Sequence, residues 1–581
     1  MTKEKYGLND EQWTAVMAKS PTIIHASAGS GKTRCLISKI RILLDQEINP
    51  ENILAITFTN KAANEMKERL KSFFPDIKKM QVSTIHSMCV QIIRKFIKHT
   101  PLKIPFSIYD DGDQLNIVKT IIKSRNFLSD PYKALEVISR VKSDLNEDIL
   151  DGDLKTIYDT YQDILLKNNA CDFDDLLVYA FKCLGNKDCH DYYSNLWQHI
   201  LCDEFQDTST IQYKILCSIQ DDLNTETLFV IGDPNQSVYG WRGARPDNMD
   251  DFIKQFKPTV CSLLYNYRSC SEVIDYANDF LQFGDPMIPK TATTGKMSFS
   301  VFNSQEDEAE KIATAIMTMG NYEETAILFR VNTRTLLFEK VFSQKRIPYK
   351  IVGALPFYRR KVAKDLLSYC KAACNHSDIE SLVRIVNTPK RGFGESKQEK
   401  LLHEGWPYLE EMALQMPLID SFIDLLKNIR DKTPFEAISE IVYQTNYREY
   451  LSKDNDRLML NSFLEVVSGF NTLEELILAS NFLEEDKGHG VKLMSAHASK
   501  GLEFDRVFVV GVEDGVWPHK LSMDSDEESR LYYVSLTRAR KYLNVSYARS
   551  KIFRGSPIEI LPSYLFTKSY ESYTKRKQKS T

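Results

Sequence analysis

Short apolar runs alternate with amphipathic stretches near the start of the chain. The runs TIIHA (22–26) and ILAITF (53–58) are each followed by a helical pattern, from Thr33 to about Gln46 and from about Asn60 to Phe73. Buried strands that alternate with helices are typical of a parallel sheet. The pattern therefore predicts an α/β fold.

A helical block interrupts this alternation, which then resumes. From about Phe96 to Asp191 the pattern is that of long amphipathic helices, and strand signals return at HILCDEF (199–205) and TLFVIGD (227–233). We therefore expect a first core built from 1–95 and 192–268, with a mainly helical insert over 96–191.

The same organisation recurs in the second half of the chain. Its strand signals are TAILF (325–329), IPYKIVG (347–353), VKLMSAH (491–497), RVFVVGV (506–512) and LNVSYA (543–548). Helix-rich sequence separates the second of these from the third. We expect a second core from 269–364 and 488–565, with a helical insert over 365–487.

Composition and charge limit the class of protein. The chain has 581 residues, more than one hydrophobic core usually serves. Its N-terminus lacks an apolar signal segment and no apolar run approaches the roughly 18 residues that span a bilayer, so we expect an intracellular protein without membrane contact. Lys and Arg number 75 against 79 Asp and Glu, a net charge of −4, so any nucleic-acid contact must be local. The basic end, 566–581, is predicted to be a disordered tail, and a tail that contacts phosphates weakly is the alternative.

A phosphate-binding loop is predicted between the first strand and the first helix. Backbone N–H groups at such a helix start can surround phosphates. Lys32 is expected to reach the β- and γ-phosphates of ATP, and Thr33 to bind Mg²⁺. The generic motif has Gly where this chain has Ala26, and a plain turn of small residues is the alternative. The loop consists of Ala26, Ser27, Ala28, Gly29, Ser30, Gly31, Lys32 and Thr33.

Two carboxylates follow the strand signal HILC at the edge where α/β sheets bind ligands. Asp203 and Glu204 open the segment DEFQD. We expect Asp203 to hold Mg²⁺ and Glu204 to accept the proton of the attacking water. An acidic loop without chemistry is the alternative.

An ordered series of motifs runs from Leu8 to about Leu565. It includes ASAGSGKTR (26–34), TFTNKAANEM (57–66), DEFQDT (203–208), GDPNQSVYGWRGA (232–244), NYRS (266–269) and SAHASKGLEFDRVFV (495–509). The series resembles that of the UvrD/Rep/PcrA family of superfamily 1 DNA helicases. The family places a similar residue at Ala26. The resemblance implies two RecA-like parallel-sheet cores, each interrupted by a helical insert, and an ATP-hydrolysing motor.

Further nucleotide contacts follow from this resemblance. It implies that Gln12 reads the adenine edge, Tyr267 stacks on the base and Arg34 flanks it. An amide can donate and accept at once, as adenine requires, and an aromatic ring offers a π surface. Glu503 is expected to bond the ribose, and Gln236 to sense the γ-phosphate.

Two arginines complete the predicted catalytic set. The resemblance implies that Arg268 and Arg538, in the second core, reach the γ-phosphate. Arginine in such a position stabilises the charge of the transferring phosphoryl group. Because both lie far along the chain from Lys32 and Glu204, we expect the site to be complete only when the two cores close.

The family places single-stranded DNA across both cores. Stacking on aromatic rings ignores base identity, which suits a motor that steps over any sequence. The matching aromatic residues are Phe58, Phe173, Tyr239 and Trp241, and the matching phosphate contacts are Asn60, His86, Arg242 and His497. For a tryptophan such as Trp241 the alternative is a place in the core.

The leading hypothesis is an ATP-dependent DNA helicase that moves 3′ to 5′ on single-stranded DNA and unwinds duplex in replication, repair or recombination. Its expected cofactors are ATP and Mg²⁺, and its expected partners are single strands, single/double-strand junctions and replication or repair proteins. The second insert is short for the family, which leaves open a translocase that strips bound proteins without efficient unwinding. A slow nucleotide-switched DNA-binding module is the other alternative, although Glu204, Arg268 and Arg538 argue against it. The sequence does not predict an oligomeric state.

Overall fold

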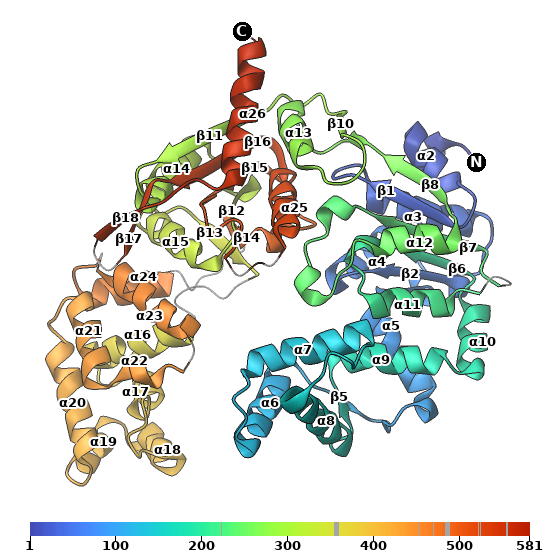
Figure 1. Cartoon of the computed structure of the whole chain (residues 1–581). Coiled ribbons are helices and arrows are strands. Elements are labelled where there is room, and N and C mark those ends of the chain that lie inside the picture. Colours follow the sequence, from blue (N-terminus) through green and yellow to red (C-terminus); the bar gives the residue numbers. More distant parts are fainter. Residues whose placement is uncertain are drawn as a thin grey trace. The chain divides into compact units, whose positions relative to one another are not determined.

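The chain forms two compact units. One contains Met1–Lys296 and Ser522–Lys541, and the other contains Met297–Leu521 and Tyr542–Thr581. Figure 1 shows the whole chain. The computed structural model describes residues 1–221, 224–353, 360–452, 454–468, 470–482, 489–520, 522, 524–553 and 556–580.

A six-stranded sheet organises the first unit. Its order is β3-β2-β6-β7-β1-β8, and all of its recorded pairings are parallel. The strands are β1 (Thr22–Ala26), β2 (Ile53–Thr57), β3 (Gln81–Thr84), β6 (His199–Cys202), β7 (Thr227–Gly232) and β8 (Thr259–Leu263). The predicted parallel α/β fold is confirmed. The edge strand β8 lacks an apolar run because most of it is exposed.

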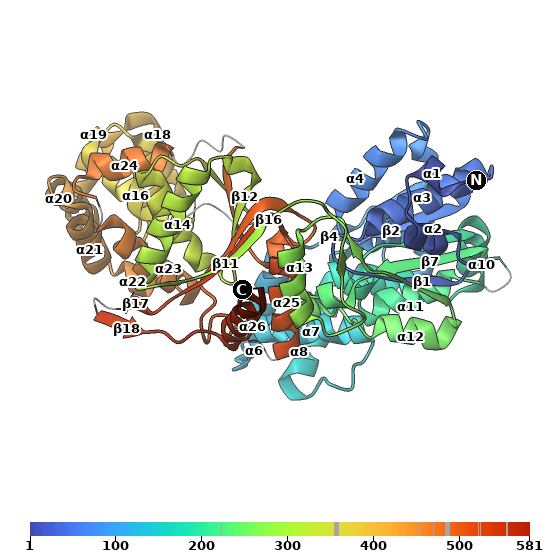
Figure 2. The ribbon, with the colours of Figure 1, turned by 90° about the horizontal axis from the view of Figure 1, so that it is seen from above.

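Side chains of successive residues point to opposite faces of this sheet. Ile24 and Phe229 belong to one apolar cluster, whereas their neighbours Ile23 and Leu228 belong to another. The first cluster takes in α2 (Asp10–Met17), α3 (Lys32–Asp45) and α4 (Asn60–Lys71). The second takes in α5 (Ile85–Lys95), α9 (Phe173–Leu184), α10 (Lys187–Leu196), α11 (Thr210–Ile219) and α12 (Asn248–Phe256). Figure 2 shows α3 and α4 on one side of the strands and α11 and α12 on the other.

The first helical insert has a small core of its own. Helices α6 (Asp111–Arg125), α7 (Pro131–Asp144) and α8 (Gly152–Lys167) share one apolar cluster. The strands β4 (Ser107–Ile108) and β5 (Ala170–Cys171) pair beside it. The predicted insert over 96–191 therefore also includes α9 and the first half of α10, although these two helices pack against the sheet and not in the core of the insert.

A second six-stranded sheet, ordered β11-β16-β15-β12-β14-β13, lies mainly in the second unit. Its central pairings β15-β12, β12-β14 and β14-β13 are parallel. The helices α14 (Gln305–Met319) and α15 (Thr335–Gln344) pack in the same apolar cluster as this sheet. The strands are β11 (Lys296–Phe302), β12 (Thr325–Phe329), β13 (Tyr349–Val352), β14 (Val491–Ser495), β15 (Phe504–Val509) and β16 (Ala539–Ala548).

The second insert is a helical bundle with one large apolar cluster (Figure 1). The cluster also takes in Leu336 of α15. The predicted end of the insert at Lys487 lies outside the described residues. Its helices are α16 (Lys361–Cys374), α17 (Ile379–Val386), α18 (Glu395–Glu404), α19 (Trp406–Ala413), α20 (Pro417–Ile429), α21 (Pro434–Gln444), α22 (Tyr447–Tyr450), α23 (Asp454–Val467) and α24 (Leu473–Phe482).

The basic end of the chain is a helix, α26 (Tyr564–Ser580), so the prediction of a disordered tail over 566–581 is wrong for its described part. Phe566, Tyr570 and Tyr573 pack their rings around Phe299, with centroid distances of 5.6, 5.8 and 5.2 Å. This spacing places three aromatic rings on one side of a helix. The basic composition of this segment favoured a prediction of disorder, so the helical spacing of its aromatic residues was overlooked. A hairpin of β17 (Ser550–Phe553) and β18 (Ser556–Glu559) precedes the helix.

Within the residues that the structure describes, no helix combines the length and the apolar character needed to cross a bilayer.

Candidate ATP site and nucleic-acid track

The predicted phosphate loop connects β1 to α3, which begins at Lys32. Gly29 and Gly31 have φ values of 66° and 90°, a left-handed backbone that favours glycine. A Cβ added to Gly31 would lie 2.7 Å from Gln12 Nε2, so this position also lacks space for a side chain. The loop has the conformation that a strand-to-helix phosphate site requires.

Hydrogen bonds to three carbonyl groups hold this loop. Gln12 Nε2 donates to Ser30 O at 2.8 Å. The segment after β8 supplies two more donors, since Asn266 Nδ2 contacts Ala28 O at 2.7 Å and Tyr267 N contacts Gly29 O at 2.9 Å. Bonds within the protein therefore fix the shape of the loop, which lowers the ordering cost of ligand binding.

The ammonium of Lys32 is buried, and no hydrogen-bond acceptor reaches Nζ within the part of the chain that the structure describes. Its ion pair with Glu204 Oε2 is long, at 3.9 Å. An unsatisfied buried ammonium is costly unless an anion accompanies it. The Lys32 ammonium is therefore suited to bind the β- and γ-phosphates of ATP, as the sequence predicts.

Thr33, Asp203 and Glu204 lie together at the carboxyl edge of the sheet. Thr33 Oγ1 lies 3.5 Å from Asp203 Oδ2. Burial, followed by the charge of Glu204, raises the pKa of Asp203 well above its usual range. A hydroxyl and a carboxylate oxygen side by side are suitable ligands for a divalent cation, so the residues present fit Mg²⁺. Glu204 itself has a φ of 51°, a conformation that is strained for a residue with a side chain.

The predicted γ-phosphate sensor meets one of the two arginines. Gln236, on the short helix η5 (Pro234–Gln236), is buried and donates from Nε2 to Asp233 Oδ2 at 2.5 Å. Arg538 Nη2 donates to Gln236 Oε1 at 3.3 Å, and Arg268 Nη1 donates to Thr537 O at 3.2 Å. Both arginines thus lie in the same hydrogen-bonded region as the sensor.

The predicted boundaries assign Arg268 to the end of the first core, 192–268, and Arg538 to the second core, 488–565. Both belong to the first unit, which contains Ser522–Lys541. Helix α25 (Ser525–Leu536) is bound there because Arg530 Nε donates to Ser237 O at 2.8 Å. The rings of Tyr532 and Phe280 also meet, with centroids 5.0 Å apart. The position of α25 along the chain does not predict which sheet this helix packs against. Gln236 and both arginines therefore lie in the first unit. That the site is complete only when the two cores close stays a prediction.

The three residues predicted to contact the base surround the start of α2. Asn9 caps this helix, donates from its N–H to Gln12 Oε1 at 3.2 Å and bonds the hydroxyl of Tyr267 through its side chain. Arg34 Nη2 would lie 3.4 Å from a Cβ at Gly7, in the turn just before α2. Tyr267 is exposed, as a stacking surface must be.

The first unit also gathers most of the predicted DNA contacts. Phe58 and Tyr239 stack on each other at 5.1 Å, and His86 meets Phe173 edge-on at 6.4 Å. Trp241 is 63% exposed. The interpretation of Trp241 as a core residue is therefore wrong. Phe173 and the Asn60 and Arg242 side chains are exposed as well.

Trp241 and Arg242 form one surface. The Arg242 guanidinium carbon lies 4.6 Å from the ring centroid of Trp241, within the range of a cation–π contact. A guanidinium beside an exposed indole can contact a phosphate while the ring stacks on the neighbouring base.

His497 and Glu503 lie on the second unit. His497 begins a short helix, η11 (His497–Ser499), directly after β14, and Glu503 is an exposed residue just before β15. Their roles at the DNA and the ribose stay predictions.

Sequence reasoning missed Gln206, Asp233 and Asn266. All three are buried polar residues that bond other members of the site. Gln206 and Asn266 lie inside the quoted segments DEFQDT and NYRS, and Asp233 inside GDPNQ. A polar residue within a motif is a usable signal, but its partner is visible only in the fold.

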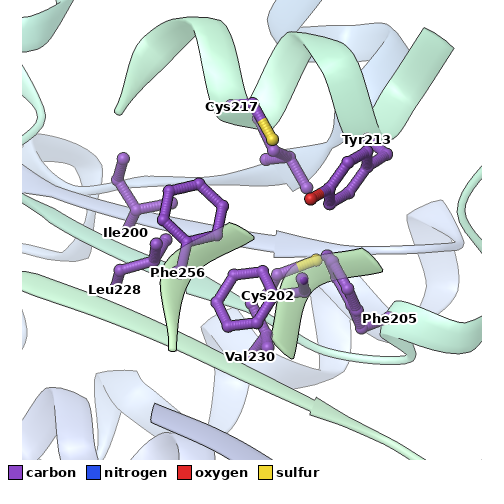
Figure 3. A pocket seen from close by; sticks show the side chains of 10 residues that line it. Ile200, Cys202, Phe205, Tyr213, Cys217, Leu228, Val230 and Phe256 are labelled. Carbon is purple, nitrogen blue, oxygen red and sulfur yellow. The ribbon is translucent and has the colours of Figure 1, made fainter. Parts of the chain in front are cut away.

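A separate apolar pocket lies between the sheet and α11 and α12 of the first unit (Figure 3). Its wall includes Ile200, Phe205, Leu228 and Phe256, together with the sulfur of Cys217. Such a wall offers no charged group to a phosphate, so this pocket does not belong to the ATP site.

These features define a P-loop ATPase with an aromatic, basic surface beside the nucleotide site. The chain matches the model of the UvrD/REP helicase N-terminal domain over residues 8–257, and that of the UvrD-like helicase C-terminal domain over 261–461 and 445–550. The ATP-dependent DNA helicase PcrA of Staphylococcus aureus (strain Mu50 / ATCC 700699) is 34% identical over 632 residues, which cover 97% of this chain and 86% of the relative. The same-named protein of Staphylococcus epidermidis (strain ATCC 12228 / FDA PCI 1200) is 34% identical over 623 residues, 96% of this chain and 85% of that one.

The chain belongs to the UvrD/Rep/PcrA family of superfamily 1 helicases. It is an ATP-hydrolysing helicase, and the predicted fold of two α/β cores with helical inserts agrees with the family.

Two substitutions separate nucleotide binding from hydrolysis. We expect Lys32→Ala to abolish turnover because the loop has no second ammonium for the β- and γ-phosphates. Glu204→Gln keeps an acceptor for its neighbours but cannot take a proton, so this variant should bind ATP and not hydrolyse it. Steady-state ATPase and equilibrium binding of a fluorescent ATP analogue measure the two effects. Glu226→Gln, at an exposed carboxylate of the same unit, is the control. Hydrolysis by Glu204→Gln at the wild-type rate would show that another group is the base.

A third substitution tests the exposed indole. We expect Trp241→Ala to weaken binding of single strands about 5- to 150-fold, because base stacking contributes roughly 1–3 kcal/mol. Its basal ATPase and melting temperature should stay near wild type, because the side chain is exposed. Fluorescence anisotropy with a labelled oligonucleotide gives the affinity. Tyr443→Ala removes another exposed ring, on α21, and should bind normally. A destabilised Trp241→Ala protein with uniformly reduced activities would contradict the stacking role.

Proposed function

We propose that this chain is an ATP-dependent DNA helicase that moves 3′ to 5′ along single-stranded DNA and unwinds duplex in replication, repair or recombination. The observation that carries the proposal is the segment from Gly232 to Ala244. It holds the buried Gln236, which bonds Arg538, and a few residues later the exposed Trp241 and Arg242. One short segment thus reaches both the nucleotide site and the predicted track. The two relatives above are named as ATP-dependent DNA helicases.

The proposed chemistry is attack of water on the γ-phosphorus of ATP. The water oxygen forms the new bond, its proton goes to the Glu204 carboxylate, and the bond to the bridging oxygen of ADP breaks. Lys32, Arg268 and Arg538 bind the phosphate oxygens and stabilise their charge. Thr33 and Asp203 are the proposed Mg²⁺ ligands, and the bound ion supplies charge neutralisation at the phosphates.

The proposed base and ribose contacts follow the family pattern. Gln12, Tyr267 and Arg34 surround the adenine, and Glu503 bonds the ribose. Single strands and single/double-strand junctions are the proposed polynucleotide partners, with replication or repair proteins as further partners. The proposed location is intracellular.

A translocase that displaces proteins without efficient unwinding is a second candidate. The observation that favours it is length, because the alignment with the relatives runs over 632 positions whereas this chain has 581 residues. The relatives therefore carry segments that this chain lacks. Loss of duplex-contacting surface would reduce strand separation and leave stepping on single strands intact.

Tailed duplexes test the proposal. We expect ATP-dependent unwinding of a duplex with a 3′ single-stranded tail and little unwinding of the same duplex with a 5′ tail. Lys32→Ala is the control for ATP dependence. Preference for the 5′ tail would overturn the polarity. Release of a protein block from a tailed strand without unwinding of naked duplex would favour the translocase, and ATPase that does not respond to DNA would favour the nucleotide switch.

A further inference from the structure

The side chain of Gln206 lies between the proposed base and the segment that holds the γ-phosphate sensor. Gln206, on the short helix η4 (Phe205–Asp207), is fully buried. Its Nε2 donates to Glu204 Oε2 at 2.6 Å, and its Oε1 accepts from the Asp233 main-chain N–H at 2.9 Å. One amide therefore contacts two motifs that come from different strands, β6 and β7.

The orientation of this amide follows from its partners. A main-chain N–H can only donate, so the oxygen of the Gln206 amide must face Asp233. The nitrogen then faces Glu204 and Asp207, and it donates to the two carboxylates at 2.6 and 3.3 Å. The shorter bond restricts the rotation of the Glu204 side chain and directs one of its two oxygens.

The close approach of the two motifs depends on Gly232. A Cβ at Gly232 would lie 2.6 Å from Gln206 Oε1 and 3.2 Å from Gln206 N. Any larger residue would displace the amide, so the absence of a side chain at the end of β7 is what lets the contact form.

The hydrogen bonds continue beyond Asp233. Its carboxylate accepts from Gln236 Nε2 at 2.5 Å, and Gln236 Oε1 accepts from Arg538 Nη2 at 3.3 Å. Glu204, Gln206, Asp233, Gln236 and Arg538 therefore form one continuous series of bonded groups. Series of this kind fix the relative positions of their members more firmly than isolated pairs do.

We infer that Gln206 is a positioning residue for hydrolysis: it orients the Glu204 carboxylate and ties that orientation to the γ-phosphate sensor. The inference rests on the proposed function, in which Glu204 takes the proton of the attacking water. A group that is misplaced by about 1 Å in such a site can cost about 10²-fold in rate. The sensor segment is the stretch 232–244, which holds Gln236. Its movement when the γ-phosphate binds or leaves would then move Glu204 as well.

A double-mutant cycle between Gln206 and Glu204 tests this inference. Gln206→Glu keeps an oxygen for the Asp233 N–H and replaces the donor that faces Glu204 with an oxygen. We expect its DNA-stimulated kcat to fall about 10- to 100-fold, with KM for ATP within about two-fold of wild type, because the proposed base loses the bond that orients it. In a Glu204→Gln background, the same change should give no further loss, since the group that it orients is already inactive.

The results that would contradict the inference distinguish a purely structural role of Gln206 from an incorrect assignment of the base. Equal fractional losses of kcat in both backgrounds, or a fall in melting temperature with losses in binding and kcat alike, would show a purely structural role and overturn the inference. If Glu204→Gln alone turned over at the wild-type rate, the proposed base would fail, and the inference with it. If Gln206→Glu does not fold, Gln206→Met removes the donor without adding a charge, and the same cycle applies.

Gln212 provides the matched control. It is another buried glutamine of this unit, and its Oε1 accepts from Ser209 N at 3.2 Å in the capping box of α11. Gln212→Met should lower the melting temperature through loss of the cap and leave kcat unchanged. A loss of kcat in this variant equal to that in Gln206→Glu would also contradict a specific role for Gln206.

Discussion

The parallel pairing of β6, β7 and β1 is the constraint on which the site depends. In a parallel sheet the carboxyl ends of neighbouring strands lie at one edge. The register pairs Cys202 with Val230 and His25 with Gly232, so the residues that follow these strands emerge side by side. The phosphate loop, Asp203 with Glu204, and the sensor segment are those residues. Backbone hydrogen bonds between the strands therefore bring these segments together, and side-chain hydrogen bonds then fix the positions of the functional groups.

The consequence is a site in which few groups are independent. Asn266 holds the phosphate loop through Ala28, and Gln206 holds both Glu204 and Asp233. The sensor segment continues without interruption to Trp241 and Arg242 on the surface. A change in the occupancy of the γ-phosphate position can reach the track through covalent neighbours, over a short stretch of chain, and this is the physical basis that we propose for coupling.

Sequence patterns predicted the parts of the fold that depend on local burial. The strands β1, β2, β6 and β7 are continuous apolar runs because they are covered on both faces, and the phosphate loop has its own spacing of glycines. The edge strand β8 carries no such run. Helix α25 could not be assigned to the first unit, because its contacts with Ser237 and Phe280 join segments far apart in the chain. The rings of α26 were present in the sequence, but their packing partner, Phe299, was not predictable.

In the proposed coupling, the state of the nucleotide site sets the affinity for the polynucleotide. This is tested by the affinity of the wild-type chain for a labelled single-stranded oligonucleotide, with and without a saturating non-hydrolysable ATP analogue and Mg²⁺. Coupling of this kind predicts a change of about 5-fold or more, and an equal reciprocal change in analogue affinity when the oligonucleotide is bound. Oligonucleotide affinity that is the same in both conditions, with the analogue shown to be bound, would contradict this coupling.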